Sequence, residues 1–219
     1  MTAHTSSPPF ATQSFQATDL TCVRGEQTLF ANLSFTLTSG ECLHVRGENG
    51  VGKTSLLRLL VGLAQPEQGQ VTWNSSNIKN DYEAFHQELC FLGHRDALKE
   101  DLSALENLMM YAALGAINLS HESALQYLWQ FGLRGREDLP VHYLSAGQKK
   151  RVVLARIAMQ GAPLWILDEP FNALDSQGVQ GFIGLLENHS SQGGITVFTG
   201  HQDINILGLK VLELLMPSS

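Results

Sequence analysis

The sequence predicts an α/β fold with a mostly parallel core sheet and an inserted helical lobe. Short apolar runs typical of buried strands alternate with stretches of helical periodicity, and this alternation favours a parallel sheet. Over about residues 103–133 the strand patterns stop and only helical patterns occur. This interruption predicts a side lobe, which we place at about residues 95–160. A length of 219 residues fits one large domain better than two.

The first half of the chain predicts strands and one buried helix. Residues 33–37 alternate apolar and polar side chains as a half-buried strand does, and residues 42–45 form a short apolar run. Residues 53–63 carry leucines around nearly the whole girth of a helix, as expected for a helix buried against a sheet. These leucines are Leu56, Leu57, Leu59, Leu60 and Leu63. Residues 71–73 and 89–92 predict further strands.

The middle of the chain contains clear helix starts. Ser103 and Glu106 form an S-x-x-E capping box, in which the two residues satisfy each other's free backbone N-H groups. Ser120 can cap a second helix that continues to Phe131. A third helix is predicted over residues 149–159.

Strand patterns resume in the last part of the chain. Apolar runs predict strands at residues 164–167, 195–198 and 211–214. A helix over residues 176–188 separates the first two of these strands, which restores the alternation expected of a parallel sheet.

The N-terminal segment and the absence of long apolar runs limit the membrane roles of the chain. Residues 1–16 are rich in Ser, Thr and Pro and lack the basic and apolar regions of a signal peptide. We therefore expect a loose tail ahead of one domain at residues 17–219. No apolar run approaches the roughly 18 residues that span a bilayer, so a membrane role requires a partner.

Charge and cysteine content argue against two further classes. The net charge of -7, with few and scattered basic residues, argues against a nucleic-acid partner. Cys22, Cys42 and Cys90 form no C-x-x-C pair, which favours reduced thiols that fill the core of a cytosolic protein.

The most specific motif is a G-x-x-x-x-G-K-[ST] pattern between a strand-like run and a helix-like run. Its residues are Gly47, Glu48, Asn49, Gly50, Val51, Gly52, Lys53 and Thr54, followed by Ser55. Glycines allow backbone conformations with positive φ, so that successive N-H groups can converge on phosphate oxygens. Lys53 is then expected on the β- and γ-phosphates of a nucleotide and the Thr54 hydroxyl on Mg²⁺. The alternative is a glycine turn with a surface lysine.

Two acidic residues follow the predicted strand at residues 164–167. A buried strand delivers Asp168 to its carboxyl end, where α/β sheets place their ligands, and we expect Asp168 to join Thr54 at Mg²⁺. Glu169 is our candidate for the general base that activates the attacking water. The alternative is a strand that ends in two solvated acidic residues. It is disfavoured because a phosphate loop precedes it in the chain.

A second anion-binding motif precedes that strand. Ser145 and Gln148 match an S-x-x-Q capping box, so a well-capped helix is the local alternative. The same geometry presents Ser145, the Gly147 N-H and a positive helix end to an anion. The run Leu144-Ser145-Ala146-Gly147-Gln148 resembles the signature motif of the ABC ATPases, with Ala146 where Gly is commoner. The resemblance implies that this motif closes over the γ-phosphate bound by a second copy of the domain.

The resemblance covers about residues 20–215 and implies further roles. It implies a P-loop ABC ATPase fold with an N-terminal antiparallel β region, and the catalytic set Lys53, Glu169 and His201, with His201 as the switch histidine. Residues 172–175 resemble the loop that lies across the family's dimer interface. Where the family usually has Gln after the strand ahead of the lobe, this chain has His94, which can still bind a metal-bound water. The aromatic residue that usually stacks on adenine in the family is not evident here, and Arg24 stands near its place, where a guanidinium can also stack on a base.

The two departures from the family pattern, at His94 and Arg24, point to a subfamily. Residues 93–99, 102–108, 52–58 and 144–148 closely resemble the ATP-binding subunit of the bacterial cytochrome c maturation heme exporter. This resemblance implies ATP and Mg²⁺ as cofactors and a peripheral place on the cytoplasmic face of the inner membrane. It also implies a homodimer around two ATP molecules, integral membrane subunits as partners and, indirectly, a periplasmic heme chaperone. The eight histidines form no C-x-x-C-H attachment site, so the residues themselves show no heme site.

Other functions account for less of the sequence. The nearest alternative is the ATPase of another small exporter with lipid, peptide or drug cargo, since the partner chooses the cargo. ABC proteins of DNA repair or of ribosomes usually carry a coiled-coil insertion or two cassettes, and this acidic chain has neither. A nonenzymatic scaffold is disfavoured by the joint presence of Lys53, Asp168, Glu169 and His201.

Overall fold

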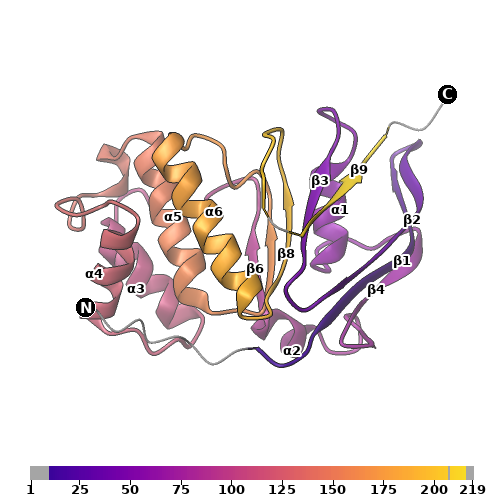
Figure 1. Cartoon of the computed structure of the whole chain (residues 1–219), viewed down its shortest axis with the longest axis horizontal. Coiled ribbons are helices and arrows are strands. Elements are labelled where there is room, and N and C mark those ends of the chain that lie inside the picture. The colour runs from indigo at the N-terminus through magenta and orange to yellow at the C-terminus, as the bar shows by residue number, and fades with distance from the viewer. Residues whose placement is uncertain (1–9, 207, 216–219) are drawn as a thin grey trace.

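The computed structural model describes residues 10–206 and 208–215. It consists of a parallel sheet, an antiparallel sheet and a group of helices (Figure 1). In Figure 1 the parallel sheet stands in the middle, with the antiparallel sheet on one side and most of the helices on the other. The predicted α/β class is confirmed.

The parallel sheet carries the strands that lead to the functional motifs. Its five strands run in the order β6-β7-β8-β3-β9, and every neighbouring pair is parallel. Their bounds are β3 Cys42–Arg46, β6 Leu89–Leu92, β7 Leu164–Leu167, β8 Ile195–Thr199 and β9 Leu209–Glu213. All five were predicted, with ends that differ by at most two residues. The carboxyl ends of these strands therefore share one edge, where ligands of α/β sheets bind.

The N-terminal part forms the expected antiparallel sheet, in the order β2-β1-β4-β5. Its strands are β1 Ser14–Arg24, β2 Gln27–Thr38, β4 Gln68–Trp73 and β5 Ser76–Asn77. We did not predict β1. Its pairing with β2 shifts register between Ala17 and Leu20, and Asp19 has a φ of 49°. These irregularities interrupt the alternation of apolar and polar residues by which a strand is recognised.

The predicted boundary of the N-terminal tail was too late. Residues 14–16 belong to β1 and pair with β2 and β4. Ahead of β1, the Phe10 N-H donates to the Gln192 carbonyl at 2.9 Å, and the Gln13 N-H donates to Ser39 Oγ at 2.7 Å. Backbone pairing holds this polar segment although its composition is that of a tail. The rest of the predicted tail, residues 1–9, lies outside the described residues.

Helix α1, Lys53–Leu60, is shorter than predicted. Four of its leucines are buried as expected, at positions 56, 57, 59 and 60, but Leu63 is 55% exposed. Gly62, with a φ of 75°, lies just beyond the helix end, so Leu63 no longer shares the periodicity that we assigned to it. The short helix α2, Tyr82–Gln87, was not predicted.

The helical lobe contains three helices that pack on one another: α3 Ala104–Leu114, α4 His121–Gln130 and α5 Ala146–Gln160. The capping box at α3 is confirmed, because Ser103 Oγ accepts from the Glu106 N-H at 3.1 Å and Glu106 accepts from the Ser103 N-H at 2.7 Å. Ser120 caps α4 as predicted. Helix α5 begins at Ala146, three residues before the predicted start, because its first turn contains the signature motif.

The two faces of the parallel sheet are covered differently. In β7, Leu164 and Ile166 pack in the core that α1 shares with the antiparallel sheet, whereas Trp165 and Leu167 pack in the core of α5 and α6. Helix α6, Ser176–Ser191, lies beside α5 on the second face (Figure 1). Burial of each Leu or Ile side chain contributes about 1.5–3 kcal/mol to the free energy of folding, so the packing on both faces stabilises the sheet.

The three cysteines are buried and free, as predicted. Burial raises the pKa of the Cys42 and Cys90 thiols to about 12. Neither thiol is therefore ionised near neutral pH. Within the described ranges, no helix combines the length and the apolar character that crossing a bilayer requires.

Candidate active site

The phosphate loop connects β3 to α1. Gly47, Gly50 and Gly52 have φ values of 142°, 84° and 111°, which side-chain-bearing residues rarely adopt. A Cβ atom at position 47 would lie 2.5 Å from the Leu214 carbonyl oxygen. The positive φ values therefore favour glycine at all three positions, and at Gly47 the close approach of the Leu214 backbone, just after β9, requires it.

Lys53 and the start of α1 point at the same loop. Gly52 is the N-cap of α1 and offers no side chain, so the first-turn N-H groups face outward without a side-chain cap. The Lys53 ammonium donates to the carbonyls of Gly47 at 2.7 Å and Glu48 at 3.0 Å. A cation and a positive helix end therefore meet at one place, which is the arrangement that attracts phosphates.

The predicted metal pair meets in the structure. The Thr54 hydroxyl donates to Asp168 Oδ2 at 2.9 Å, although the two residues are 114 positions apart. Asp168 follows β7 directly and is buried. Within the described residues no three His, Cys, Asp or Glu side chains gather as a metal site. A hydroxyl and one carboxylate nevertheless suit Mg²⁺, which usually keeps waters and phosphate oxygens among its ligands.

Thr199 also contacts Asp168, and this role was not predicted from the sequence. Its hydroxyl donates to Asp168 Oδ1 at 2.7 Å and accepts from the Glu169 N-H at 2.9 Å. Thr199 ends β8, the neighbour of β7, so one fully buried hydroxyl holds both acidic residues. A threonine at the end of an apolar strand is too common to signal this role in a sequence.

Glu169 has an unusual backbone conformation. Its φ of 49° lies in the left-handed region, which is costly for a residue with a side chain and is found most often at functional sites. The Asn172 amide donates to its carboxylate. This contact fixes the carboxylate that we expect to accept a proton from water.

His201 lies beside the phosphate loop and Glu169, and its contact with a γ-phosphate stays a prediction. Its Nε2 is 3.0 Å from Asn49 Oδ1 in the phosphate loop and 3.9 Å from Glu169 Oε1. Because an amide oxygen only accepts, Nε2 is assigned the proton. The structure thus brings His201, Glu169 and the loop together from distant parts of the chain.

One hollow of about 240 Å³ contains most of the predicted nucleotide-binding residues. It is lined by loop residues together with Arg24, Leu29, His94 and Glu169. Arg24 and His94, the two departures from the family pattern, therefore reach the hollow that the phosphate loop forms. Their contacts with adenine and with a metal-bound water stay predictions.

Three of the signature residues line another hollow, whereas Ala146 lines one together with His94, Asp168 and Glu169. Ser145 Oγ accepts from the Gln148 N-H at 3.3 Å, and Gln148 Oε1 accepts from the Ser145 N-H at 2.9 Å, so both cap α5. With Gly147 they line a hollow of about 460 Å³ near Arg151 and Asp175. Bonding to the Gly178 N-H and to Arg151 lowers the pKa of Asp175. No signature residue lines the phosphate hollow in the described part of this chain.

Thr199→Val is expected to lower kcat for ATP hydrolysis about tenfold, because Asp168 and Glu169 lose the hydroxyl that aligns them. The matched control is Thr196→Val on the same strand. Thr196 is equally buried and bonds to His189, far from the acidic pair. Both variants should lose about 1 kcal/mol of unfolding free energy. Steady-state ATPase assays and thermal melts compare them, and equal losses of kcat would contradict a role specific to Thr199.

The chain is similar in sequence to known proteins. Residues 30–172 match the ABC transporter family. A cytochrome c biogenesis ATP-binding export protein, CcmA, from Dechloromonas aromatica (strain RCB) is 50% identical over 199 residues. That match covers 91% of this chain and 98% of the relative.

Two solved structures show the same fold. A putative ABC transporter ATP-binding protein from Pyrococcus furiosus superposes with a TM-score of 0.81 at 20% identity, over 92% of this chain and 97% of that one. A dimeric ATP-binding cassette in a post-hydrolysis state with ADP and Pi gives a TM-score of 0.73 at 23% identity, over 86% and 88% of the two chains. At these identities the likeness concerns the fold alone.

Proposed function

The chain belongs to the ABC transporter family, and on that premise we propose that it hydrolyses ATP for a membrane complex that handles heme in c-type cytochrome biogenesis. The observation that carries the ATPase part is the meeting of Thr54, Asp168, Glu169 and His201 around the phosphate loop. The cytochrome part rests on the relative named above, which is matched over 98% of its length.

In the proposed reaction, ATP + H₂O → ADP + phosphate, each residue of the site has its own role. Lys53 and the loop N-H groups bind the β- and γ-phosphates and offset the charge that develops on them. Thr54 and Asp168 hold Mg²⁺, which when bound supplies further neutralisation of phosphate charge. Glu169 orients the attacking water and accepts its proton, while His201, which lines a neighbouring hollow with Gly47 and Glu48, contacts the γ-phosphate.

We further propose that Arg24 stacks on adenine and that His94 takes the place usually held by Gln. Both line the phosphate hollow, and Leu29 adds an apolar contact there. A guanidinium plane can stack on a base, although it supplies less apolar area than an aromatic ring.

The proposed working unit is a homodimer that binds two ATP molecules. Ser145, Gly147 and Gln148 line a hollow separate from that of the phosphate loop, which supports a second copy as the source of the signature residues at the γ-phosphate. In our proposal, closure of this dimer moves integral membrane subunits at the cytoplasmic face of the inner membrane. A periplasmic heme chaperone would act downstream of those subunits.

Catalysis across the dimer predicts complementation between two inactive variants. Ser145→Asp keeps a good helix cap but repels the γ-phosphate, and Lys53→Ala removes the phosphate-binding ammonium. In their heterodimer one site carries both changes and the other carries neither. A 1:1 mixture should therefore recover up to about a quarter of the wild-type rate if the two sites act independently.

Each variant at the same total concentration serves as the control, and a tag on one copy reports heterodimer formation. If heterodimers form and the mixture is no more active than either variant alone, catalysis between two copies is wrong.

The heme assignment is tested by purifying the chain with its membrane subunits and identifying what copurifies. We expect heme, measured by its absorbance and by its pyridine complex. A lipid, peptide or drug as the only cargo would assign the ATPase to another exporter.

A further inference from the structure

A buried histidine outside the phosphate hollow connects β3 to the segment that carries His201. His44 is fully buried in β3 and stacks on Phe198 of β8, with ring centroids 4.5 Å apart. Its Nε2 lies 3.1 Å from the carbonyl oxygen of Gly200, the residue before His201. Nothing in the catalytic scheme above uses this side chain.

The Gly200 carbonyl needs such a partner because the sheet ends beside it. Pairing of β3 with β8 stops at Val45 and Thr199, since the chain after Arg46 leaves the sheet to form the phosphate loop. A buried carbonyl without a donor costs about 1–3 kcal/mol. The His44 ring replaces the backbone donor that a longer strand would have supplied.

The contacts of His44 also fix its tautomer. The Arg46 Nε-H donates to His44 Nδ1 at 3.1 Å, and a guanidinium can only donate. Nδ1 is therefore the acceptor, and Nε2 carries the proton that is donated to Gly200. Burial lowers the pKa of His44, which favours this neutral form, although the bond to Gly200 opposes the shift.

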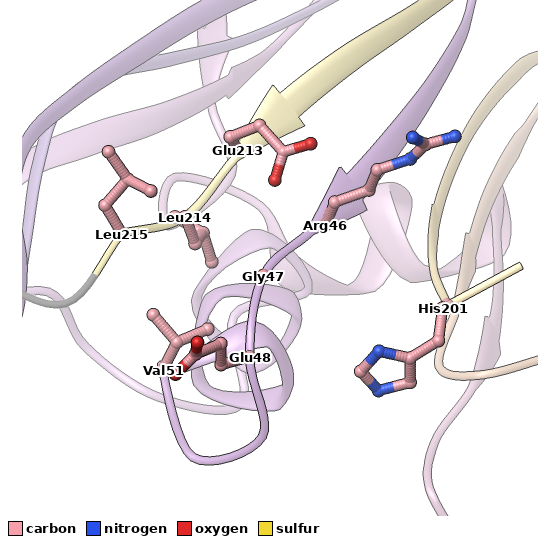
Figure 2. Close-up of a pocket in the computed structure, with 9 residues that line it drawn as sticks. Arg46, Gly47, Glu48, Val51, His201, Glu213, Leu214 and Leu215 are labelled. Carbon is pink, nitrogen blue, oxygen red and sulfur yellow. The ribbon is translucent and has the colours of Figure 1, made fainter. Parts of the chain in front are cut away.

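Arg46, also in β3, contacts the other end of the same segment. Its guanidinium contacts Asp203 at 3.0 Å, an exposed pair that contributes little stability by itself. Arg46 and His201 line one hollow of about 560 Å³ (Figure 2). Figure 2 shows Arg46 at the end of β3 and His201 across from the phosphate loop. Two residues of β3, His44 and Arg46, thus contact the two ends of the segment 200–203.

We propose that His44 is a positioning residue for hydrolysis, which holds the Gly200 carbonyl and thereby keeps His201 against the phosphate loop. This inference rests on the ATPase function proposed above. The Gly200 carbonyl belongs to the peptide group that joins Gly200 to His201. Fixing this group therefore fixes the direction in which the His201 side chain leaves the backbone. The 3.0 Å contact from His201 to Asn49 depends on that direction. Displacements of about 1 Å at a reacting group can cost a hundredfold in rate.

Two amide substitutions separate the two hydrogen bonds of His44. In His44→Gln the amide nitrogen can take the place of Nε2 and donate to Gly200. In His44→Asn the shorter side chain can replace only Nδ1 and leaves Gly200 without its donor. We expect kcat of His44→Gln within about threefold of wild type, whereas His44→Asn should lose about tenfold with KM for MgATP little changed.

A double-mutant cycle distinguishes positioning from a general loss of stability. In a His201→Ala background, His44→Asn should change the remaining single-turnover rate by less than about twofold, because its effect acts through His201. His44→Met fills the same core space without a donor. It repeats the test if the Asn variant does not fold, as thermal melting will show.

The position of His201 can be followed without any turnover. In NMR spectra of the full chain, the His201 ring resonance, assigned with His201→Ala, should move in His44→Asn or His44→Met and stay near the wild-type position in His44→Gln. An unmoved resonance in the Asn and Met variants, equal kcat in the Gln and Asn variants, or a full tenfold effect without His201 would each overturn the proposal. A wild-type chain that hydrolyses no ATP even with its membrane subunits would instead contradict the proposed function, while the NMR comparison would still test His44.

Discussion

Glu169→Gln is expected to bind MgATP and to hydrolyse it about 10²–10⁴-fold more slowly than wild type, the range that a general base contributes. Glutamine keeps the shape of the side chain and an oxygen that can accept from Asn172, but it cannot take a proton from water. The phosphate loop, Thr54 and Asp168 are untouched. The variant should therefore accumulate as a nucleotide-bound dimer.

Steady-state ATPase rates and sedimentation velocity, measured on the same samples, check both parts of this expectation. Glu187→Gln is the matched control, because Glu187 is exposed on α6 and the substitution removes the same charge. It should leave the rate and the sedimentation unchanged. Hydrolysis by the Glu169 variant at near wild-type rate would remove Glu169 from the role of base.

Lys53→Ala is expected to abolish hydrolysis and to weaken MgATP binding. The substitution removes the only side-chain cation that contacts the phosphate loop in the described structure, and it leaves the carbonyls of Gly47 and Glu48 without their donor. Loss of one charge-assisted contact costs about 1.5–3 kcal/mol, or roughly 10- to 150-fold in affinity. Titration calorimetry with MgATP measures the binding, and Lys79→Ala, at an exposed lysine, is the control.

In cells, Lys53→Ala should leave the protein with its membrane partners but stop production of c-type cytochromes. Dimer closure driven by bound phosphate is the two-state element that would move those partners. Staining of c-type cytochromes and an assay of heme on its chaperone measure this outcome. Normal cytochrome levels with an inactive ATPase, in cells that have one copy of the gene, would point to another exporter and leave the ATPase assignment standing.

Motifs that act through neighbouring residues could be predicted from the sequence. The capping boxes of α3 and α5 join residues three positions apart, so the order of residues alone specifies them. The glycine pattern likewise specifies positive φ at Gly47, Gly50 and Gly52. The fully apolar run of β7 predicted a buried strand that Asp168 follows directly, and its bounds were correct.

Errors arose where the sheet tolerated an irregular strand and where a local helix end was overlooked. Strand β1 has register shifts that the sheet tolerates, so its alternation is irregular and its start at Ser14 was missed. Leu63 continued an apolar pattern beyond Gly62, where the chain had already left the helix.

By itself, then, the sequence determined the phosphate loop, the acidic pair at the end of β7, the capped helices and the ABC family, because each of these is encoded in consecutive residues. Only the tertiary structure decided that Thr199 holds both acids and that His44 holds Gly200. These bonds join residues 31 and 156 positions apart. Their partners become neighbours only when parallel strands bring their carboxyl ends to one edge, and no spacing along the chain records which side chains will then face each other.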